Sequence, residues 1–159
     1  MSAADLVAQV VDPELPMLTL VDLGVVRSVE ERDGVVVTLT PTYSGCPAVE
    51  VMRADVAAHL RAAGYERVEV RTVLSPAWST DRITEEGRAK LAAHGIAPPG
   101  RASHRTGPIP LTLGPPGGAR CPQCGSPETV ELSRFGPTPC TALRRCRACS
   151  EPFQEMKTL

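Results

Sequence analysis

Cys121-Pro122-Gln123-Cys124 and Cys146-Arg147-Ala148-Cys149 are two Cys-x-x-Cys pairs near the C-terminus of the chain. Because residues 125–145 lie between them, the four thiols can meet only if this segment folds back as a hairpin, as it does in a zinc ribbon. Four sulfur ligands complete a tetrahedron around Zn²⁺ and leave no open position for a substrate. The spacing therefore predicts a structural Zn²⁺ bound by Cys121, Cys124, Cys146 and Cys149.

Other uses of these cysteines stay open at this point. Four thiolates also hold iron–sulfur clusters, and Cys140, inside the hairpin, is an alternative ligand or else a small buried hydrophobic residue. Disulfides are disfavoured, because the N-terminus has no secretory signal and the cysteines have metal-ligand spacing. So short a segment cannot build a large core, and metal binding should therefore contribute to its folding free energy.

Composition restricts the function classes. The chain has 159 residues, of which 42% are hydrophobic and 22% charged, with a formal net charge of −1. This is a globular mixture with room for one ordinary domain and a small appendage. A net charge so close to zero argues against a basic nucleic-acid-binding protein. No apolar run approaches the length of a membrane span, so we expect a cytoplasmic protein without membrane contacts.

The N-terminal part alternates between helical and strand patterns. Ser2 and Asp5 fit a capping box, and Asp33-Gly34 is suited to the tight turn of a β-hairpin. The expected elements are a helix ending near Val11, hairpin strands over 25–29 and 35–40, a helix over 49–60, a strand over 68–74 and a helix over 82–93. This order predicts an α+β domain in which one helical layer covers a small sheet.

Proline and glycine are concentrated over residues 98–118, a composition typical of a linker. The sequence therefore predicts a domain over residues 1–97, a linker over 98–118 and a zinc ribbon over 119–159.

Cys46 lies in the turn Thr42-Tyr43-Ser44-Gly45-Cys46-Pro47. Pro47 suits the first position of a helix, which makes Cys46 its N-cap, with a sulfur close to the unpaired amides of the first turn. Such amides favour the thiolate, so we expect a lowered pKa and a reactive or transiently metal-binding thiol. The alternative is a small buried residue. Asp12 and Glu14, in a rigid proline-rich loop, are either turn and surface residues or weak metal ligands.

Several motifs resemble the PaaD family of phenylacetate-degradation proteins, which belongs to the SufT-like iron–sulfur assembly proteins. They occur in a specific order along nearly the whole chain and end with the four-cysteine ribbon. The motifs are Asp12-Pro13-Glu14-Leu15-Pro16, Val21-Asp22-Leu23-Gly24, Thr40-Pro41-Thr42-Tyr43-Ser44-Gly45-Cys46-Pro47 and Ser75-Pro76-Ala77-Trp78. The resemblance implies a SufT-like α+β domain followed by a zinc ribbon with four cysteine ligands.

The same resemblance implies an accessory or maturation role in the multicomponent oxygenase that epoxidises the ring of phenylacetyl-CoA. The partners would be the oxygenase and reductase subunits. A homodimer of this chain is compatible with such a role. Cys46 would be the transfer thiolate for iron or an iron–sulfur cluster, with Asp12, Glu14 and Asp22 as nearby carboxylates. No histidine is placed in sequence to act as a base for Cys46, so we expect no catalytic residue. The alternative function is a protein- or nucleic-acid-binding ribbon with no metal transfer.

Overall fold

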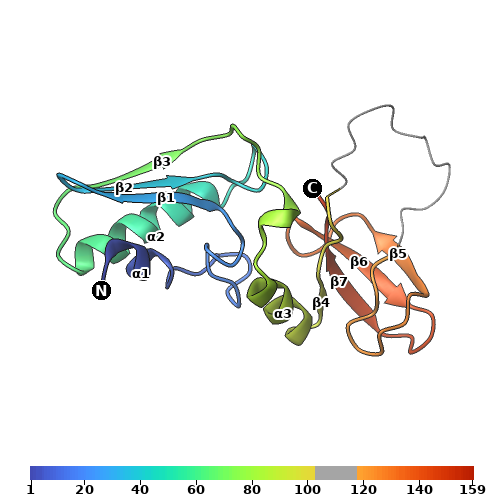
Figure 1. Ribbon diagram of the computed structural model, residues 1–159. Coiled ribbons are helices and arrows are strands. Elements are labelled where there is room, and N and C mark those ends of the chain that lie inside the picture. Colours follow the sequence, from blue (N-terminus) through green and yellow to red (C-terminus); the bar gives the residue numbers. More distant parts are fainter. Residues whose placement is uncertain (103–117) are drawn as a thin grey trace. The chain divides into compact units, whose positions relative to one another are not determined.

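The computed structural model describes residues 1–102 and 118–159 and divides into two compact units, Met1–Lys90 and Leu91–Leu159. Each unit has its own β-sheet, and the two are treated separately below (Figure 1). Of the helices in these described residues, none has both the length and the apolar content that crossing a bilayer requires.

The first unit contains a three-stranded sheet in the order β1-β2-β3. Strands β1 and β2 are antiparallel, whereas β2 and β3 are parallel, because helix α2 crosses over between them. The elements are α1 (Ala3–Val7), β1 (Val26–Glu31), β2 (Val35–Leu39), α2 (Val49–Ala62), β3 (Val68–Thr72) and a 3₁₀ turn (Thr80–Arg82). Helix α3 (Glu85–Ala93) begins in this unit and ends in the second. The expected α+β class is confirmed.

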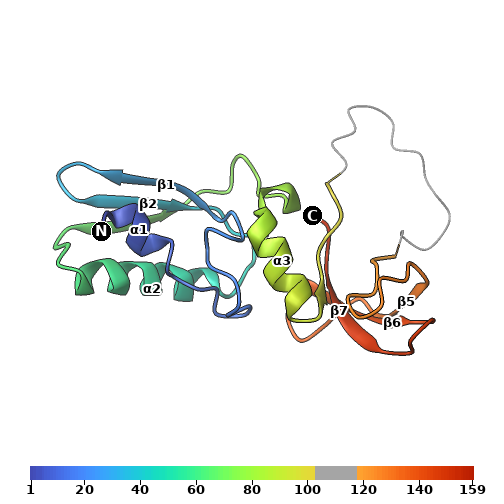
Figure 2. The same cartoon turned by 60° about the horizontal axis from the view of Figure 1, so that its bottom comes forward.

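The core of this unit lies between α2 and the sheet. Met52, Val56 and Leu60 recur at helical spacing on α2 and are buried, while alternate residues of β2, Val35 and Val37, are buried with them. Helices α1 and α2 lie on the same side of the sheet in both views (Figures 1 and 2). The burial of one helical stripe and of alternate strand residues is what gives this segment its layered form.

A long irregular segment joins α1 to β1 and carries all three candidate carboxylates, Asp12, Glu14 and Asp22. Helix α1 has the expected capping box but ends at Val7, earlier than expected. Buried leucines then anchor the segment, and the indole N–H of Trp78 donates to the carbonyl of Leu23 at 2.8 Å. These contacts hold the loop against the unit although it has no regular structure.

The second unit is a four-stranded sheet in the order β4-β7-β6-β5. Its strands are β4 (Ile96–Ala97), β5 (Thr129–Ser133), β6 (Thr141–Cys146) and β7 (Pro152–Met156). Strands β5, β6 and β7 form an antiparallel meander, and β4 adds in parallel to β7. Residues 96–97, which the sequence placed in the N-terminal domain, thus pair with the ribbon. Most of the expected linker, residues 103–117, lies outside the described residues.

Candidate metal sites

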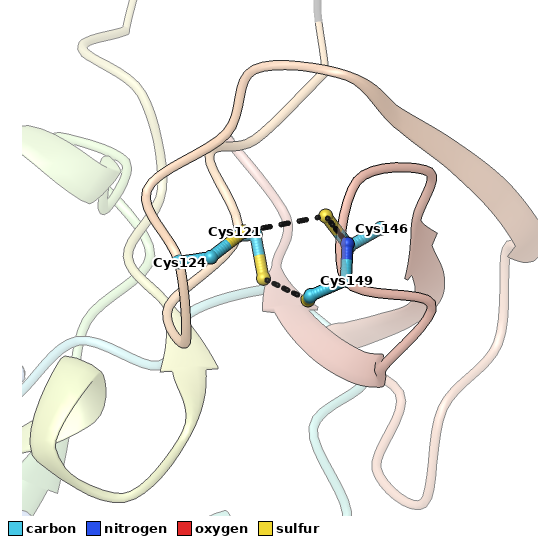
Figure 3. A group of neighbouring side chains, drawn as sticks. All are labelled: Cys121, Cys124, Cys146 and Cys149. Carbon is cyan, nitrogen blue, oxygen red and sulfur yellow. Dashed lines mark hydrogen bonds between the residues drawn. The ribbon is translucent and has the colours of Figure 1, made fainter.

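The four cysteines of the two Cys-x-x-Cys pairs meet at one end of the second unit. Their sulfur atoms all lie within 4.8 Å of one another, with 3.7 Å between Cys121 and Cys149 and 3.6 Å between Cys124 and Cys146. Four sulfurs about 2.3 Å from a central ion would be about 3.8 Å apart in a regular tetrahedron. The pairs face each other across a space that fits one such ion (Figure 3).

The hairpin of the ribbon brings the two pairs together. The first pair lies in the turn before β5, and the second begins with Cys146 at the end of β6 and continues into the turn before β7. Cys121 and Cys146 are buried, whereas Cys124 and Cys149 are exposed. A closed set of four sulfur donors on two fixed turns suits a structural ion and offers no position to a substrate.

Backbone N–H groups stabilise the thiolate form of Cys146. The amide of Cys149 lies 3.5 Å from the sulfur of Cys146 and, with the amide of Ala148 and the neighbouring thiols, lowers the pKa of Cys146 to about 6. One thiolate is therefore favoured before any ion arrives, which suits a site whose ligands must lose their protons to bind metal.

Cys140 lies outside this group of four. It is buried, and its sulfur is 3.1 Å from the hydroxyl of Thr138, while its carbonyl accepts a hydrogen bond from the amide of Lys157. These contacts fit the role of a small buried residue at the start of β6.

Cys46 lies just before α2, half-buried, in the turn that the sequence singled out. The amide of Ala48 and the side chain of Thr42 both donate towards its sulfur. Thr42 was not among the expected site residues, although it belongs to the same quoted turn. The helix proper begins at Val49 with Ala48 as its cap residue, but the amide contact expected of an N-terminal cysteine is present.

The expected low pKa of Cys46 is wrong. Burial raises the pKa of this thiol above its ordinary value of 9.0, and the negative charges of Glu14 and Asp12 raise it further. These effects outweigh the hydrogen bonds from Ala48 and Thr42, because a thiolate loses solvation in a half-buried turn next to two carboxylates. The same interaction shows that the loop carrying Asp12 and Glu14 lies near Cys46.

Asp12 is a buried carboxylate whose Oδ1 accepts hydrogen bonds from the amides of Glu14 (2.8 Å) and Leu15 (2.7 Å). Burial nevertheless raises its pKa, and burial together with the charge of Asp12 raises the pKa of Glu14. Within the described residues, the ribbon cysteines are the group that gathers as a metal site, and Cys46, Asp12 and Glu14 are not drawn together so closely. Any ion held at Cys46 would therefore meet an open and incomplete set of donors.

Asp22 is bound to Lys90 and Thr19. Its Oδ2 accepts hydrogen bonds from Lys90 (2.8 Å) and from the amide of Thr19 (2.9 Å). Burial alone would raise the pKa of Asp22, but the hydrogen bonds from Lys90 and Thr19 lower it. These contacts join the loop before β1 to helix α3, which is a structural use of the carboxylate.

Two family models match the chain. The model described as "Iron-sulfur cluster assembly protein" matches residues 4–72, which include Cys46, Asp12 and Glu14. The model described as "PaaD zinc beta ribbon domain" matches residues 105–157, which include the four-cysteine group. The two matches fall on the two candidate sites.

One curated relative covers nearly the whole chain. It is a protein of Escherichia coli (strain K12) named "Putative 1,2-phenylacetyl-CoA epoxidase" and identified in that name as the D subunit. The two chains are 42% identical over 156 residues, which are 97% of this chain and 90% of the relative.

Solved structures resemble part of the chain. A domain of unknown function, DUF59, from Bacillus anthracis is 31% identical with a TM-score of 0.51, covering 56% of this chain and 87% of that one. A conserved hypothetical protein from Thermotoga maritima is 29% identical with a TM-score of 0.47, covering 56% and 89%.

The resemblance drawn from the motifs is confirmed by the identity and coverage of the curated relative and by the two family models. The chain belongs to the PaaD family, with an iron–sulfur cluster assembly domain followed by a zinc β-ribbon.

Proposed function

We propose that this protein helps to metallate a subunit of the oxygenase that epoxidises the ring of phenylacetyl-CoA, by holding iron or an iron–sulfur cluster briefly at Cys46. Two findings support this role: the name of the Escherichia coli relative, and the match of an iron–sulfur cluster assembly model to residues 4–72. The cargo is the substrate of this step, and the oxygenase and reductase subunits are its recipients.

The observation that carries the proposal is that the charges of Asp12 and Glu14, in the loop before β1, act on the half-buried thiol of Cys46 in the turn before α2. One sulfur and two carboxylates are a mixed and incomplete donor set, which binds iron weakly compared with four thiolates. The raised pKa of Cys46 also weakens metal binding at this thiol. Because metal binding must displace the thiol proton, a proton competes with the cargo and promotes its release.

The ribbon would instead hold its metal ion permanently. We infer that its four cysteines hold Zn²⁺, since the sulfur spacing fits a four-coordinate ion and the family model is that of a zinc ribbon. The ion would stabilise the second unit and take no part in transfer. In this role the protein works in the cytoplasm and has no nucleic-acid or membrane partner.

The test compares two cysteine variants of the full chain, Cys46→Ala and Cys140→Ala, each produced together with the oxygenase and reductase subunits. Cys140 is the matched control, because it is the other cysteine outside the four-cysteine group. Iron and acid-labile sulfide are then measured in the purified partner subunits. We expect partner subunits poor in iron with Cys46→Ala and normal ones with Cys140→Ala, while both variants keep one zinc. Fully metallated partners with Cys46→Ala would refute the transfer role.

A second candidate role is a protein-binding module without metal transfer. It is favoured by two exposed apolar side chains of the ribbon, Leu132 (56% exposed) and Phe135 (72% exposed). In that case Phe135→Ala should weaken association with the oxygenase subunits, whereas Cys46→Ala should leave both association and metal content unchanged. Affinity capture by the tagged full chain, followed by iron analysis of what is captured, separates the two roles.

A further inference from the structure

An arginine stands directly before each Cys-x-x-Cys pair and bonds to the far end of the same turn. The guanidinium of Arg120 donates to the carbonyl of Gly125 at 3.1 Å. That of Arg145 donates to the carbonyl of Ser150 at 3.2 Å. In both cases the acceptor is the residue immediately after the second cysteine. The two halves of the site thus repeat one arrangement, Arg-Cys-x-x-Cys followed by the accepting residue.

The accepting residues share an unusual backbone conformation. Gly125 has φ of 74° and Ser150 has φ of 65°, and among residues 1–102 and 118–159 Ser150 is the one non-glycine residue with positive φ. A residue with a Cβ adopts this conformation at a cost, so the surrounding contacts must hold it there. At Ser150 the contact to its carbonyl comes from Arg145.

The turn that each arginine holds also carries the sulfur ligands. In the first pair, the amide of Cys121 donates to the carbonyl of Ser126 at 2.9 Å, and the amide of Ser126 donates towards the sulfur of Cys124. A shift of this turn would therefore move a ligand and remove its amide donor.

The second pair repeats both contacts. The amide of Cys146 donates to the carbonyl of Glu151 at 2.9 Å, and the amide of Glu151 donates towards the sulfur of Cys149. Charge-assisted hydrogen bonds from guanidinium groups are among the stronger polar contacts in proteins. Hydrogen bonds outside the ligand set orient the ligands of metal sites, and here they act on the turns that carry the cysteines.

We propose that Arg120 and Arg145 are positioning residues of the metal centre, each locking one turn so that the bound ion is released slowly. The inference concerns the ribbon and does not rest on the proposed role of Cys46.

The test measures metal release from the full-length protein loaded with Zn²⁺, as transfer to an excess of a chromogenic chelator. Arg120→Gln and Arg145→Gln remove the hydrogen bonds, and Arg147→Gln is the matched control. Arg147 is exposed and lies between the cysteines of the second pair, so its loss changes the charge near the ion by the same amount. We expect about tenfold faster release from each of the first two variants and less than about a twofold change with Arg147→Gln.

Loading with Co²⁺ checks that each variant still forms the site, because sulfur-to-cobalt charge-transfer absorption reports four-thiolate coordination. The proposal is overturned if Arg120→Gln and Arg145→Gln release Zn²⁺ at the wild-type rate. It is equally overturned if Arg147→Gln accelerates release as much, since charge alone would then explain the effect.

A second-site variant tests the mechanism itself. In the Arg145→Gln background, Ser150→Gly should slow the release again, because glycine keeps a positive φ without help from the arginine. Release as fast as in Arg145→Gln alone would mean that the arginine does not act through this turn, and would also overturn the proposal.

Discussion

At the scale of single residues, the surroundings of Cys46 determine the pKa of its thiol. Sequence position alone pointed to a helix N-terminus and a stabilised thiolate. The structure adds burial and the charges of Asp12 and Glu14, both of which oppose ionisation. No pattern within residues 42–47 contains this information, because the carboxylates come from the loop before β1, which strands β1 and β2 separate from Cys46 in the sequence. The candidate residues were therefore identifiable from the sequence, while the sign of the pKa shift was not.

The pH dependence of Cys46 alkylation should reveal how burial and the two carboxylates change the pKa of this thiol. A raised pKa means that the thiolate appears at higher pH, so the midpoint of the rate–pH profile for Cys46 should lie above 9.0. Glu14→Gln removes one opposing charge and should move the midpoint to lower pH. The rate is followed by mass spectrometry of the Cys46 peptide after iodoacetamide treatment of the zinc-loaded protein.

Glu50→Gln provides the control for this measurement. Glu50 is exposed at the first turn of α2 and pairs with Arg53 at 3.0 Å, so its loss should leave the Cys46 midpoint in place. A midpoint below the ordinary value in the wild-type protein, or equal shifts with both variants, would contradict the assignment.

At the scale of elements, the turn Val21–Gly24 fixes how the chain enters β1. Gly24 has φ of 66°, and a Cβ built there would meet the carbonyl oxygen of Arg82 and lie 2.7 Å from the Cβ of Arg82. Both the backbone conformation and the close approach therefore require glycine.

Two glycine variants separate these causes. Gly24→Ala should destabilise the first unit by about 3 kcal/mol, through backbone strain and overpacking together. Gly64→Ala, at φ of 98° with no atom within 4 Å of the added Cβ, should cost only about 1 kcal/mol from strain. Urea unfolding followed by circular dichroism measures both. Equal losses would show that contact with Arg82 is unimportant.

Most elements were predictable because their signals are local. The hairpin through Asp33-Gly34, helix α2 and strand β3 follow from turn chemistry and periodicity over a few residues. The parallel pairing of β2 with β3 was not predicted, although a helix between two strands of one sheet is the usual sign of it. Strand β4 consists of Ile96–Ala97 alone, too short for any period to be visible, and its partner β7 is remote in sequence.

At the scale of the whole molecule, two units with separate sheets should respond differently to loss of metal. The Zn²⁺ proposed for the ribbon would contribute to the folding free energy of the second unit, whereas the first unit has a hydrophobic core of its own. The sequence predicted this division from its cysteines and its proline-rich segment, but placed the boundary by composition. The structure divides into two compact units between Lys90 and Leu91, and Ile96–Ala97 pair with β7 of the ribbon.

Chelation should therefore unfold one unit selectively. After zinc is stripped from the wild-type protein, amides of β5 and β6 should lose their protection from hydrogen exchange, while those of β1 and β2 keep it. Cys121→Ala should give the same pattern without a chelator, and Cys46→Ala should retain one equivalent of zinc and full protection. Simultaneous loss of protection in both sheets would show that the protein unfolds as a single cooperative body.

The short strand β4 has a practical consequence for dissecting the protein. A fragment that stops at residue 97 would take away the outermost strand of the ribbon, and a fragment that starts at 119 would leave the flank of β7 bare and open to association. Cutting between Lys90 and Leu91 instead keeps both described sheets whole, although it divides helix α3 (Glu85–Ala93) three residues before its end.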